Sequence, residues 1–363
     1  MKFYKPRFWD RREFSIWPYV FYPFSVVVNL VNLLKFKYSK IEKFNIPIIS
    51  IGNIYLGGTG KTPLCIAIFQ ILRSLKINAS FIKKYYEKFS DETKLLENVG
   101  KVFLNKQRSE AIKASINNKF QVVILDDGFQ DPSIKSDISI VCFNEKQWIG
   151  NGFVIPSGPL REKLTALKRC NYVFINGKQN WEFEKIIKKF NPKVKIFYTQ
   201  YKLINLDDIK NKKVLAFAGI ANPTNFFDLL KNNNIEIIKT LNFPDHYNFK
   251  KKDIVNLNNK AKELNACLVT TEKDYFRLNN EDRKNINCLK IELLINNKKC
   301  YDLMKYSELD NCHCSLWENP QLGSDQILIH NKGVHLDKGI QIIHIFSVIT
   351  MVTVLIVFVT PDN

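Results

Sequence analysis

One short segment constrains this chain more than any other, a glycine-rich turn between an apolar run and a run with helical period. The turn reads Gly57-Gly58-Thr59-Gly60-Lys61-Thr62. Before it, Ile46–Ile51 is rich in β-branched residues typical of a buried strand, and Leu64–Phe69 follows with helical spacing. Strand, glycine turn and helix in this order predict a phosphate-binding loop. The alternative is a chance glycine turn ahead of a helix.

The predicted loop gives each of its residues a role toward a nucleoside triphosphate. The glycines let backbone N–H groups converge on phosphate oxygens, and the positive end of the helix adds to the attraction. Binding is therefore expected from Gly57, Gly58, Thr59, Gly60, Lys61 and Thr62. Lys61 would reach the β- and γ-phosphates, and the Thr62 hydroxyl would bind Mg²⁺. The strict motif has glycine where this chain has Tyr55.

A second strand carries two adjacent carboxylates. Val122–Leu125 is apolar and β-branched, and Asp126 and Asp127 follow directly, ahead of Gly128. In a protein with a phosphate-binding loop, such a strand lies beside the loop's strand, and its terminal acid holds Mg²⁺ directly or through water. Asp126 and Asp127 are therefore predicted metal ligands together with Thr62. Alone, Asp-Asp-Gly is more often a turn.

The net charge and the cysteines indicate which classes of binding partner this chain is suited to. The chain has 363 residues and a net charge of +19, much of it lysine scattered among Asn and Ile, which biased codon usage alone can produce. An anionic membrane surface or a phosphorylated substrate would also suit this charge. Nucleic acid is not expected, because no motif for it is visible. The dispersed cysteines fit reduced thiols, and Cys312-His313-Cys314 lacks a second pair for a zinc site.

Apolar strands alternate with helical segments in two series, which predicts two P-loop- or Rossmann-like three-layer α/β domains with parallel sheets. The expected first domain is 41–201 and the second 202–306, joined by the polar stretch Lys202–Lys213. The expected strands of the first are Ile46–Ile51, Ala79–Ile82, Val122–Leu125, Ile138–Phe143 and Tyr172–Ile175, with helices Pro63–Leu75 and Ser109–Ile116. Those of the second are Val214–Gly219, Glu236–Thr240 and Ala266–Thr270, with helices Thr224–Asn232 and Lys251–Leu264.

Both ends of the chain carry apolar segments. Residues 1–40 include Phe14–Leu34, whose aromatic and basic flanks suit a membrane-associated amphipathic helix, or a helix packed on the protein's own core. Residues 307–363 form an atypical tail, in which 339–360 is uncharged and long enough to span a bilayer. A buried strand pair or a non-native tail are the alternatives. Lysines before this run and none after it would leave the body cytoplasmic.

Further segments make the motif set specific. In order they are Gly150-Asn151-Gly152, Ile155-Pro156-Ser157-Gly158-Pro159-Leu160-Arg161-Glu162, Ala218-Gly219-Ile220-Ala221-Asn222-Pro223, Phe226-Phe227, Phe243-Pro244-Asp245-His246-Tyr247 and Thr270-Thr271-Glu272-Lys273-Asp274. With the glycine loop and the acidic strand, the chain from about Phe8 to about Glu292 resembles the tetraacyldisaccharide 4′-kinases of lipid A synthesis.

That resemblance implies an enzyme that uses ATP and Mg²⁺ to phosphorylate the 4′-hydroxyl of a lipid A disaccharide monophosphate. It implies a site between two α/β domains at the cytoplasmic face of the inner membrane, on an anionic surface, and no protein partner is evident. Asp91, in Ser90-Asp91-Glu92, would take the sugar hydroxyl's proton, supported by His246, and Lys61 would act on the phosphates. Substrate contacts are expected from Arg161, Glu162 and Asn151.

The chain departs from the family pattern near the nucleotide loop. The family's Ser-Arg-Gly-Tyr aligns with Lys83-Lys84-Tyr85-Tyr86, the glycine-rich stretch before Asp91 is nearly absent, and Asp131 stands where histidine is common. Two other functions remain open. One is a P-loop ATPase that is not a kinase, although such proteins usually place a second lysine early in the loop. The other is an inactive, membrane-anchored relative of the kinase.

Overall fold

The structure is a computed structural model that describes residues 5–10, 13–85 and 90–296. The chain divides into two compact units, residues 1–293 and residues 294–363. All elements below belong to the first unit, apart from the last residues of β12. The expected tail from residue 307, its apolar segment 339–360 and Cys312-His313-Cys314 lie outside the described residues.

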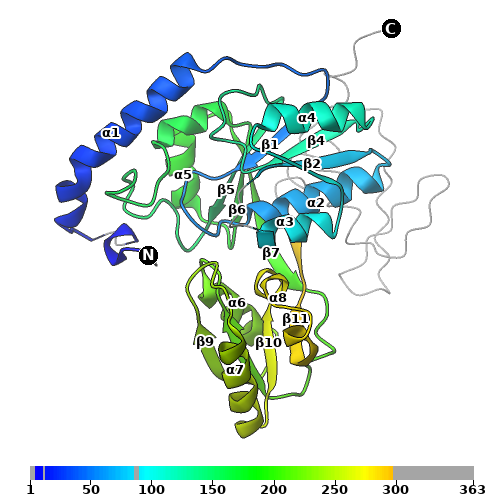
Figure 1. The fold of residues 1–363 in the computed structure, drawn as a ribbon. Coiled ribbons are helices and arrows are strands. Elements are labelled where there is room, and N and C mark those ends of the chain that lie inside the picture. Colours follow the sequence, from blue (N-terminus) through cyan, green and yellow to red (C-terminus); the bar gives the residue numbers. More distant parts are fainter. Residues whose placement is uncertain (1–4, 11–12, 86–89, 297–363) are drawn as a thin grey trace, which may run out of the picture. The chain divides into compact units, whose positions relative to one another are not determined.

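The larger sheet has eight strands in the order β12-β7-β6-β5-β1-β4-β2-β3. Figure 1 labels β1, β2, β4, β5, β6 and β7 of this sheet. Every neighbouring pair from β7 to β3 is parallel. The strands are β1 (Ile48–Gly52), β2 (Ala79–Lys84), β3 (Val102–Asn105), β4 (Val122–Asp126), β5 (Ile138–Asn144), β6 (Tyr172–Asn176), β7 (Lys195–Leu203) and β12 (Ile291–Asn296).

The centre of this sheet is apolar on both faces. Every residue of β1 and β4 is buried, as expected for parallel strands covered on each side by helices. The helices of this part of the chain are α2 (Lys61–Ser74), α3 (Ser90–Glu97), α4 (Arg108–Asn117) and α5 (Trp181–Phe190). Helix α2 packs on β1, β2 and β4 and buries a stripe of Leu64, Cys65, Ile68 and Leu72. This packing fixes the start of α2, and with it the glycine loop.

A smaller sheet follows in the order β11-β10-β8-β9, and all its pairs are parallel. Its strands are β8 (Val214–Ala218), β9 (Ile237–Asn242), β10 (Cys267–Thr271) and β11 (Ile286–Leu289), and its helices are α6 (Pro223–Asn232), α7 (Lys251–Glu263) and α8 (Glu272–Arg277). Short 3₁₀ turns lie at Arg7–Trp9, Leu164–Arg169 and Asp282–Asn285.

The predicted fold class, two parallel α/β sheets with an N-terminal apolar helix, is confirmed. The pattern missed α3, β3, α5, β7, α8, β11 and β12. Strand β7 continues through Leu203, so residues 204–213 join the sheets rather than Lys202–Lys213. The domain boundaries at 40, 201 and 306 stay a prediction. Cys65 and Cys142 are buried free thiols, and Cys267 is half-buried.

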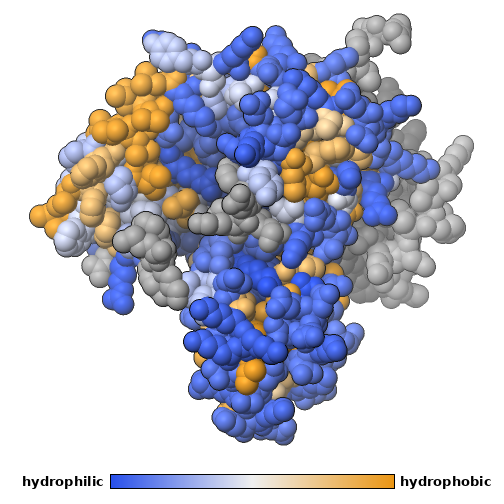
Figure 2. Space-filling model, in the orientation of Figure 1, coloured by the Kyte–Doolittle hydropathy of each residue, from blue (hydrophilic) through white to orange (hydrophobic). Residues whose placement is uncertain are grey.

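Helix α1 (Trp17–Tyr38) differs from the other helices in its exposure. Only Pro18 and Ser25 are buried in it, and its large apolar side chains form the orange band along α1 in Figure 2. It contacts the part of the chain around the larger sheet through polar and aromatic groups: Ser25 Oγ donates to Val154 O at 2.8 Å, and the rings of Tyr19 and Tyr22 lie edge-on to Phe153. Among the described residues, α1 alone has the length and composition to cross a membrane, and a signal sequence or a core helix can meet the same criteria.

Candidate active site

The glycine loop leaves the larger sheet at the carboxyl end of its central strand. Strand β1 lies between β4 and β5, and the loop after it leads directly into α2. In open α/β sheets ligands bind at this edge, where the strand order reverses. Gly57 and Gly60 have φ values of +124° and +91°, which residues with a Cβ rarely adopt. The loop therefore has the geometry that the sequence predicts for phosphate binding.

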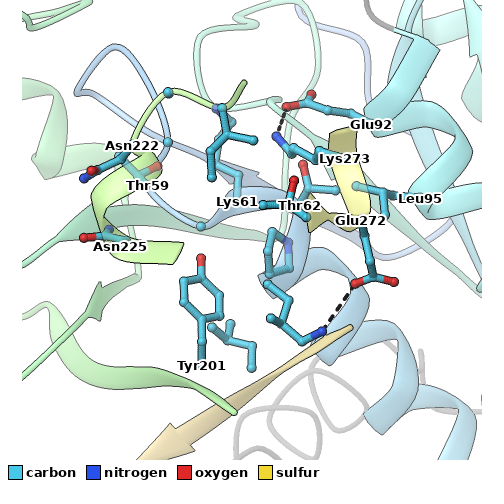
Figure 3. Close-up of a pocket in the computed structure, with 18 of the residues that line it drawn as sticks. Thr59, Lys61, Thr62, Glu92, Leu95, Tyr201, Asn222, Asn225, Glu272 and Lys273 are labelled. Carbon is cyan, nitrogen blue, oxygen red and sulfur yellow. Dashed lines mark hydrogen bonds and ion pairs between the residues drawn. The ribbon is translucent and has the colours of Figure 1, made fainter. Parts of the chain in front are cut away.

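A pocket of about 770 Å³ opens over this loop. Residues next to both sheets line it, including Gly57, Gly58, Thr59, Gly60, Lys61, Thr62, Glu92, Asp127, Arg161, Tyr201, Asn222, Asn225, His246 and Lys273. Figure 3 labels Thr59, Lys61, Thr62, Glu92, Tyr201, Asn222, Asn225 and Lys273 among them. Among the described residues, the lining combines the glycine loop with the apolar side chains of Ile220, Phe226 and Leu229 and with charged groups of both signs: the cations are Lys61, Arg161 and Lys273, and the carboxylates are Glu92, Asp127, Asp245, Glu272 and Glu292. The pocket therefore offers cations that can bind a triphosphate and apolar side chains that can contact an apolar group.

The loop holds a polar atom whose partner is missing from the described residues. Thr59 is 3% exposed, and its Oγ1 is buried without a hydrogen-bond partner among them. A buried hydroxyl left unpaired costs free energy, so native proteins usually satisfy it. Lys61 Nζ lies 3.2 Å from Asn53 Oδ1 and faces the same pocket. A phosphate oxygen in the loop would satisfy Thr59 and neutralise Lys61, so the residues present fit a nucleotide.

Asp127 is neutralised from two sides. Arg161 Nη1 donates to both of its carboxylate oxygens, at 2.8 and 3.0 Å, and Lys61 Nζ lies 3.6 Å from Oδ1. Burial by itself raises the pKa of Asp127, but the charges of Lys61 and Arg161 outweigh it and lower the pKa to about 2. Asp127 has φ +59°, so the chain turns at this residue. The turn separates its side chain from that of Asp126.

Asp126 is paired with a lysine of the neighbouring strand. The register of β2 against β4 sets Ile82 opposite Leu125, so Lys83 comes beside Asp126. Lys83 Nζ donates to Asp126 Oδ2 and, at 2.9 Å, to Glu92 Oε2. Burial by itself lowers the pKa of Lys83, yet the charges of Asp126 and Glu92 raise it well above its usual value. The ammonium is therefore charged and lies between two carboxylates.

The start of α3 connects the two sheets. Glu92 Oε1 accepts from Lys273 Nζ at 2.6 Å, and Asp91 Oδ2 accepts from Arg277 Nε at 3.0 Å. Lys273 and Arg277 both belong to α8, which packs against α3. Two adjacent acids of the first sheet's domain therefore pair with two bases from the second. These contacts bring the second sheet's residues to the glycine loop.

His246 completes this group from the loop after β9. Its Nδ1 lies 3.4 Å from Asp91 Oδ2 and 3.3 Å from Arg277 Nη2, and its side chain lines the pocket. Asp91 is 2% exposed. Burial by itself raises the pKa of Asp91, but the hydrogen bond with His246 and the charge of Arg277 hold it well below its usual range. The imidazole thus faces the pocket with an ionised carboxylate behind it.

The oxygen donors of the site fit a magnesium ion that arrives with phosphate. Among the described residues, no three His, Cys, Asp or Glu side chains gather as a ready metal site. Mg²⁺ in such sites is held by one or two carboxylates together with substrate phosphates, so a complete protein cage is not needed. Buried Asp126 is the last residue of β4, the strand next to β1, and Thr62 is the second residue of α2. Both are hard oxygen donors.

The structure brings together most of the predicted site residues, whose roles stay predictions. Lys61, Thr62, Asp127, Arg161 and His246 line the pocket, and Asp91 and Asp126 lie directly behind it. Asn151 and Glu162 do not line this pocket. Asn151 donates to Phe8 O and Ser157 O, and Glu162 pairs with Arg169 at 2.8 Å. Their predicted contact with substrate finds no support in this pocket.

Four charged residues of the site received no role from the sequence. They are Lys83, Glu92, Lys273 and Arg277. Glu92 and Lys273 stand inside quoted motifs, beside Asp91 and Asp274, so their position in those motifs was an available signal. Arg277 lies one helical turn after Asp274, which it contacts at 2.8 Å. Lys83 stands where the family's Ser-Arg-Gly-Tyr segment has serine, so this departure from the family pattern was an available signal.

Comparison with known proteins gives one consistent result. The family model described as tetraacyldisaccharide-1-P 4′-kinase matches residues 17–90 and 82–307. The tetraacyldisaccharide 4′-kinase of Pelagibacter ubique is 43% identical over 302 residues, 82% of this chain and 96% of that protein. The enzyme of the same name from Rickettsia felis is 32% identical over 315 residues, 82% of this chain and 95% of that protein.

A solved structure agrees at the level of the fold. The crystal structure of LpxK from Aquifex aeolicus, in complex with ATP, superposes with a TM-score of 0.60 at 21% sequence identity. The match covers 79% of this chain and 98% of that one. The two chains therefore share their arrangement of sheets and helices.

The neutralised Asp127 predicts how stability responds to acid. Because its pKa is lower in the folded protein than in an unfolded chain, its ion pairs stabilise the fold above about pH 4 and lose this contribution as the pH falls toward 2. The urea midpoint should fall less steeply over this interval in Asp127→Asn than in the wild type. Asp207→Asn, which removes an exposed carboxylate, is the control and should follow the wild type. Equal slopes for all three proteins would contradict the assignment.

Proposed function

Since the chain belongs to the tetraacyldisaccharide-1-P 4′-kinase family, we propose that it transfers the γ-phosphoryl group of ATP to the 4′-hydroxyl of a lipid A disaccharide 1-phosphate. One observation carries the proposal beyond family membership. A single pocket is lined both by the glycine loop and by His246, which contacts Asp91. A phosphate donor and an alcohol acceptor can therefore be held against each other in one cavity.

On the donor side, the chain supplies positive charge where phosphoryl transfer needs it. The transition state spreads negative charge over the phosphoryl oxygens, so positioning and charge neutralisation supply most of the catalysis. Lys61 and Arg161 line the pocket and both pair with Asp127, and the residues of the glycine loop line the same pocket. Thr62 and Asp126 would hold Mg²⁺, with Asp127 close by, and the bound ion would neutralise further charge on the phosphates.

On the acceptor side, we infer that Asp91 and His246 act as one unit. His246 faces the pocket, and Asp91 lies buried behind it with its carboxylate oxygen 3.4 Å from Nδ1. A buried carboxylate orients an imidazole and stabilises the charge that the ring gains with a proton. The proton of the sugar hydroxyl would pass to this pair as the hydroxyl attacks phosphorus. Arg277 fixes Asp91 and so positions both groups.

Two other functions are less well supported. In a P-loop ATPase that is not a kinase, water is the acceptor of the phosphoryl group. That function does not explain why the Asp91 carboxylate and the His246 imidazole lie together at this pocket. An inactive relative would be free to lose charged groups. Here Lys61, Asp91, Asp127 and His246 are all present and each has a charged partner within 4 Å.

The first test is the reaction itself. Purified protein is given Mg-ATP and a lipid A disaccharide 1-phosphate, and the product is followed by mass for the gain of one phosphate. Lys61→Met should reduce turnover by about 10²-fold or more, because it removes a charge that stabilises the transition state. Lys101→Met is the control and should remain active, because Lys101 is an exposed lysine directly before β3. Normal turnover in Lys61→Met would contradict the assignment of the glycine loop as the phosphate-binding loop.

A second experiment tests the acceptor side. Asp91→Asn keeps the size of the side chain but removes its negative charge, so kcat should fall by about 10²–10⁴-fold while ATP affinity changes little. The kcat of His246→Ala should fall by a similar factor. The double variant should be no worse than the poorer single variant, because groups that act as a unit are not additive. Multiplicative losses, or a loss of ATP binding alone, would show that the two residues act separately.

We propose in addition that α1 attaches the protein to an anionic membrane surface. Val20, Val27 and Val31 are about half exposed on it, together with Trp17 and Tyr22. Apolar side chains with aromatic residues and nearby lysines suit the interface between headgroups and acyl chains. A lipid substrate presented at that surface would then be close to the enzyme.

This attachment can be tested by charge. Val27→Glu together with Val31→Glu places two carboxylates one helical turn apart on α1, and should reduce co-sedimentation with vesicles of phosphatidylglycerol and phosphatidylethanolamine severalfold. Activity on detergent-solubilised substrate should persist, because neither residue lines the pocket. Val255→Glu, at an exposed valine of α7, is the matched control. If all three proteins bind the vesicles equally, α1 is not the attachment site.

A further inference from the structure

A buried lysine lies where the site would be expected to place a divalent cation. Lys83 is 5% exposed and lies between Asp126 and Glu92, to which it donates from β2. Asp126 is itself 1% exposed, and its other oxygen, Oδ1, accepts from Cys65 Sγ at 3.7 Å. Both oxygens of the predicted metal ligand therefore have partners within the protein.

The position of Lys83 is not explained by contact with a ligand. Lys61 and Lys273 line the pocket, whereas Lys83 does not. Its charge therefore reaches the site only through Asp126 and Glu92. Burying an ammonium is costly unless it is fully paired, and here two carboxylates pair with it. Glu92 in turn pairs with Lys273, so a row of alternating charges runs from Asp126 to α8.

We propose that Lys83 is a resident cation that holds Asp126 and Glu92 in place of a divalent ion until nucleotide binds, and so makes metal binding dependent on nucleotide. This inference rests on the proposed function, because it takes Asp126 as a metal ligand. Lys83 is then a positioning residue. It acts on the metal through the carboxylates that it contacts.

The charge balance gives the reason. In the protein without nucleotide, a divalent ion at Asp126 would compete with Lys83 for Oδ2 and would meet the ammonium at close range. Asp127 offers little help, because Arg161 and Lys61 already neutralise it. A bound triphosphate adds several negative charges and supplies further oxygen ligands. The positive charges of the metal ion and of Lys83 can then both be neutralised. The metal ion and the nucleotide therefore bind cooperatively.

The test uses Mn²⁺ as a paramagnetic substitute for Mg²⁺, with the free ion measured by electron paramagnetic resonance during titration of the full-length protein. Wild-type protein should bind Mn²⁺ weakly without nucleotide and much more tightly with a non-hydrolysable ATP analogue. Lys83→Met should bind Mn²⁺ without nucleotide about tenfold more tightly than the wild type, since it removes the competing charge. Its dependence on nucleotide should shrink accordingly.

Two further variants serve as a substitute for Lys83→Met and as a control. Lys83→Gln keeps hydrogen-bond donors near both carboxylates but no charge, and it serves if Lys83→Met does not fold. It should likewise gain Mn²⁺ affinity. Lys101→Met removes one exposed positive charge away from the site and should match the wild type. Melting temperatures with and without Mn²⁺, in the absence of nucleotide, give a second readout: the ion should raise the value of the Lys83 variants more than that of the wild type.

The outcomes separate this inference from the function it rests on. Equal Mn²⁺ affinities for wild type and both Lys83 variants without nucleotide would overturn the role of Lys83, even if the enzyme is an active kinase. Failure of the wild type to bind Mn²⁺ with the ATP analogue would instead argue against the proposed metal site. The comparison without nucleotide decides the role of Lys83 in either case.

Discussion

The site depends on how two adjacent carboxylates at the end of β4 are neutralised. Asp126 and Asp127 bring two like charges to the buried edge of a sheet, where unpaired charges would be expensive. The left-handed turn at Asp127 directs the two side chains to different partners, Lys83 on one side and Lys61 with Arg161 on the other. Lys61 and Arg161, the cations that neutralise Asp127, also line the pocket, so the same two charges can serve a phosphate.

The same requirement connects the two sheets. Asp91 and Glu92 begin a short helix whose partners, Arg277 and Lys273, come from the second sheet. Buried ion pairs add little net stability, but breaking one leaves an uncompensated charge. The contacts between α3 and α8 are therefore best understood as specifying a geometry. They set His246 beside Asp91 and bring it to the pocket that the glycine loop lines.

The apolar periodicity of short segments predicted those elements whose burial and backbone conformation are determined within the segment itself. The strand, loop and helix around Gly60 are encoded within some twenty residues, because burial, positive φ and helix period all occur in one segment. Helix α3 was missed because it is only eight residues long and its apolar side chains are confined to the adjacent pair Leu95 and Leu96. Strand β7 was missed because only two of its nine residues are buried and the others are half-buried or exposed, so its pattern is not continuously apolar. The family resemblance, rather than periodicity, pointed to Asp91 and His246.

The contacts of Lys83 show why the rest of the site could not be predicted. Its neighbour is decided by the register of β2 on β4, forty residues apart in sequence, and by the start of α3. A lysine in a strand is ordinarily a sign of solvent, and here the next residue, Lys84, is indeed exposed. Strand alternation turns one lysine outward and the other into the site. The same residue type on the same strand thus has opposite surroundings, and only the carboxylates of β4 and α3 make the buried one tolerable.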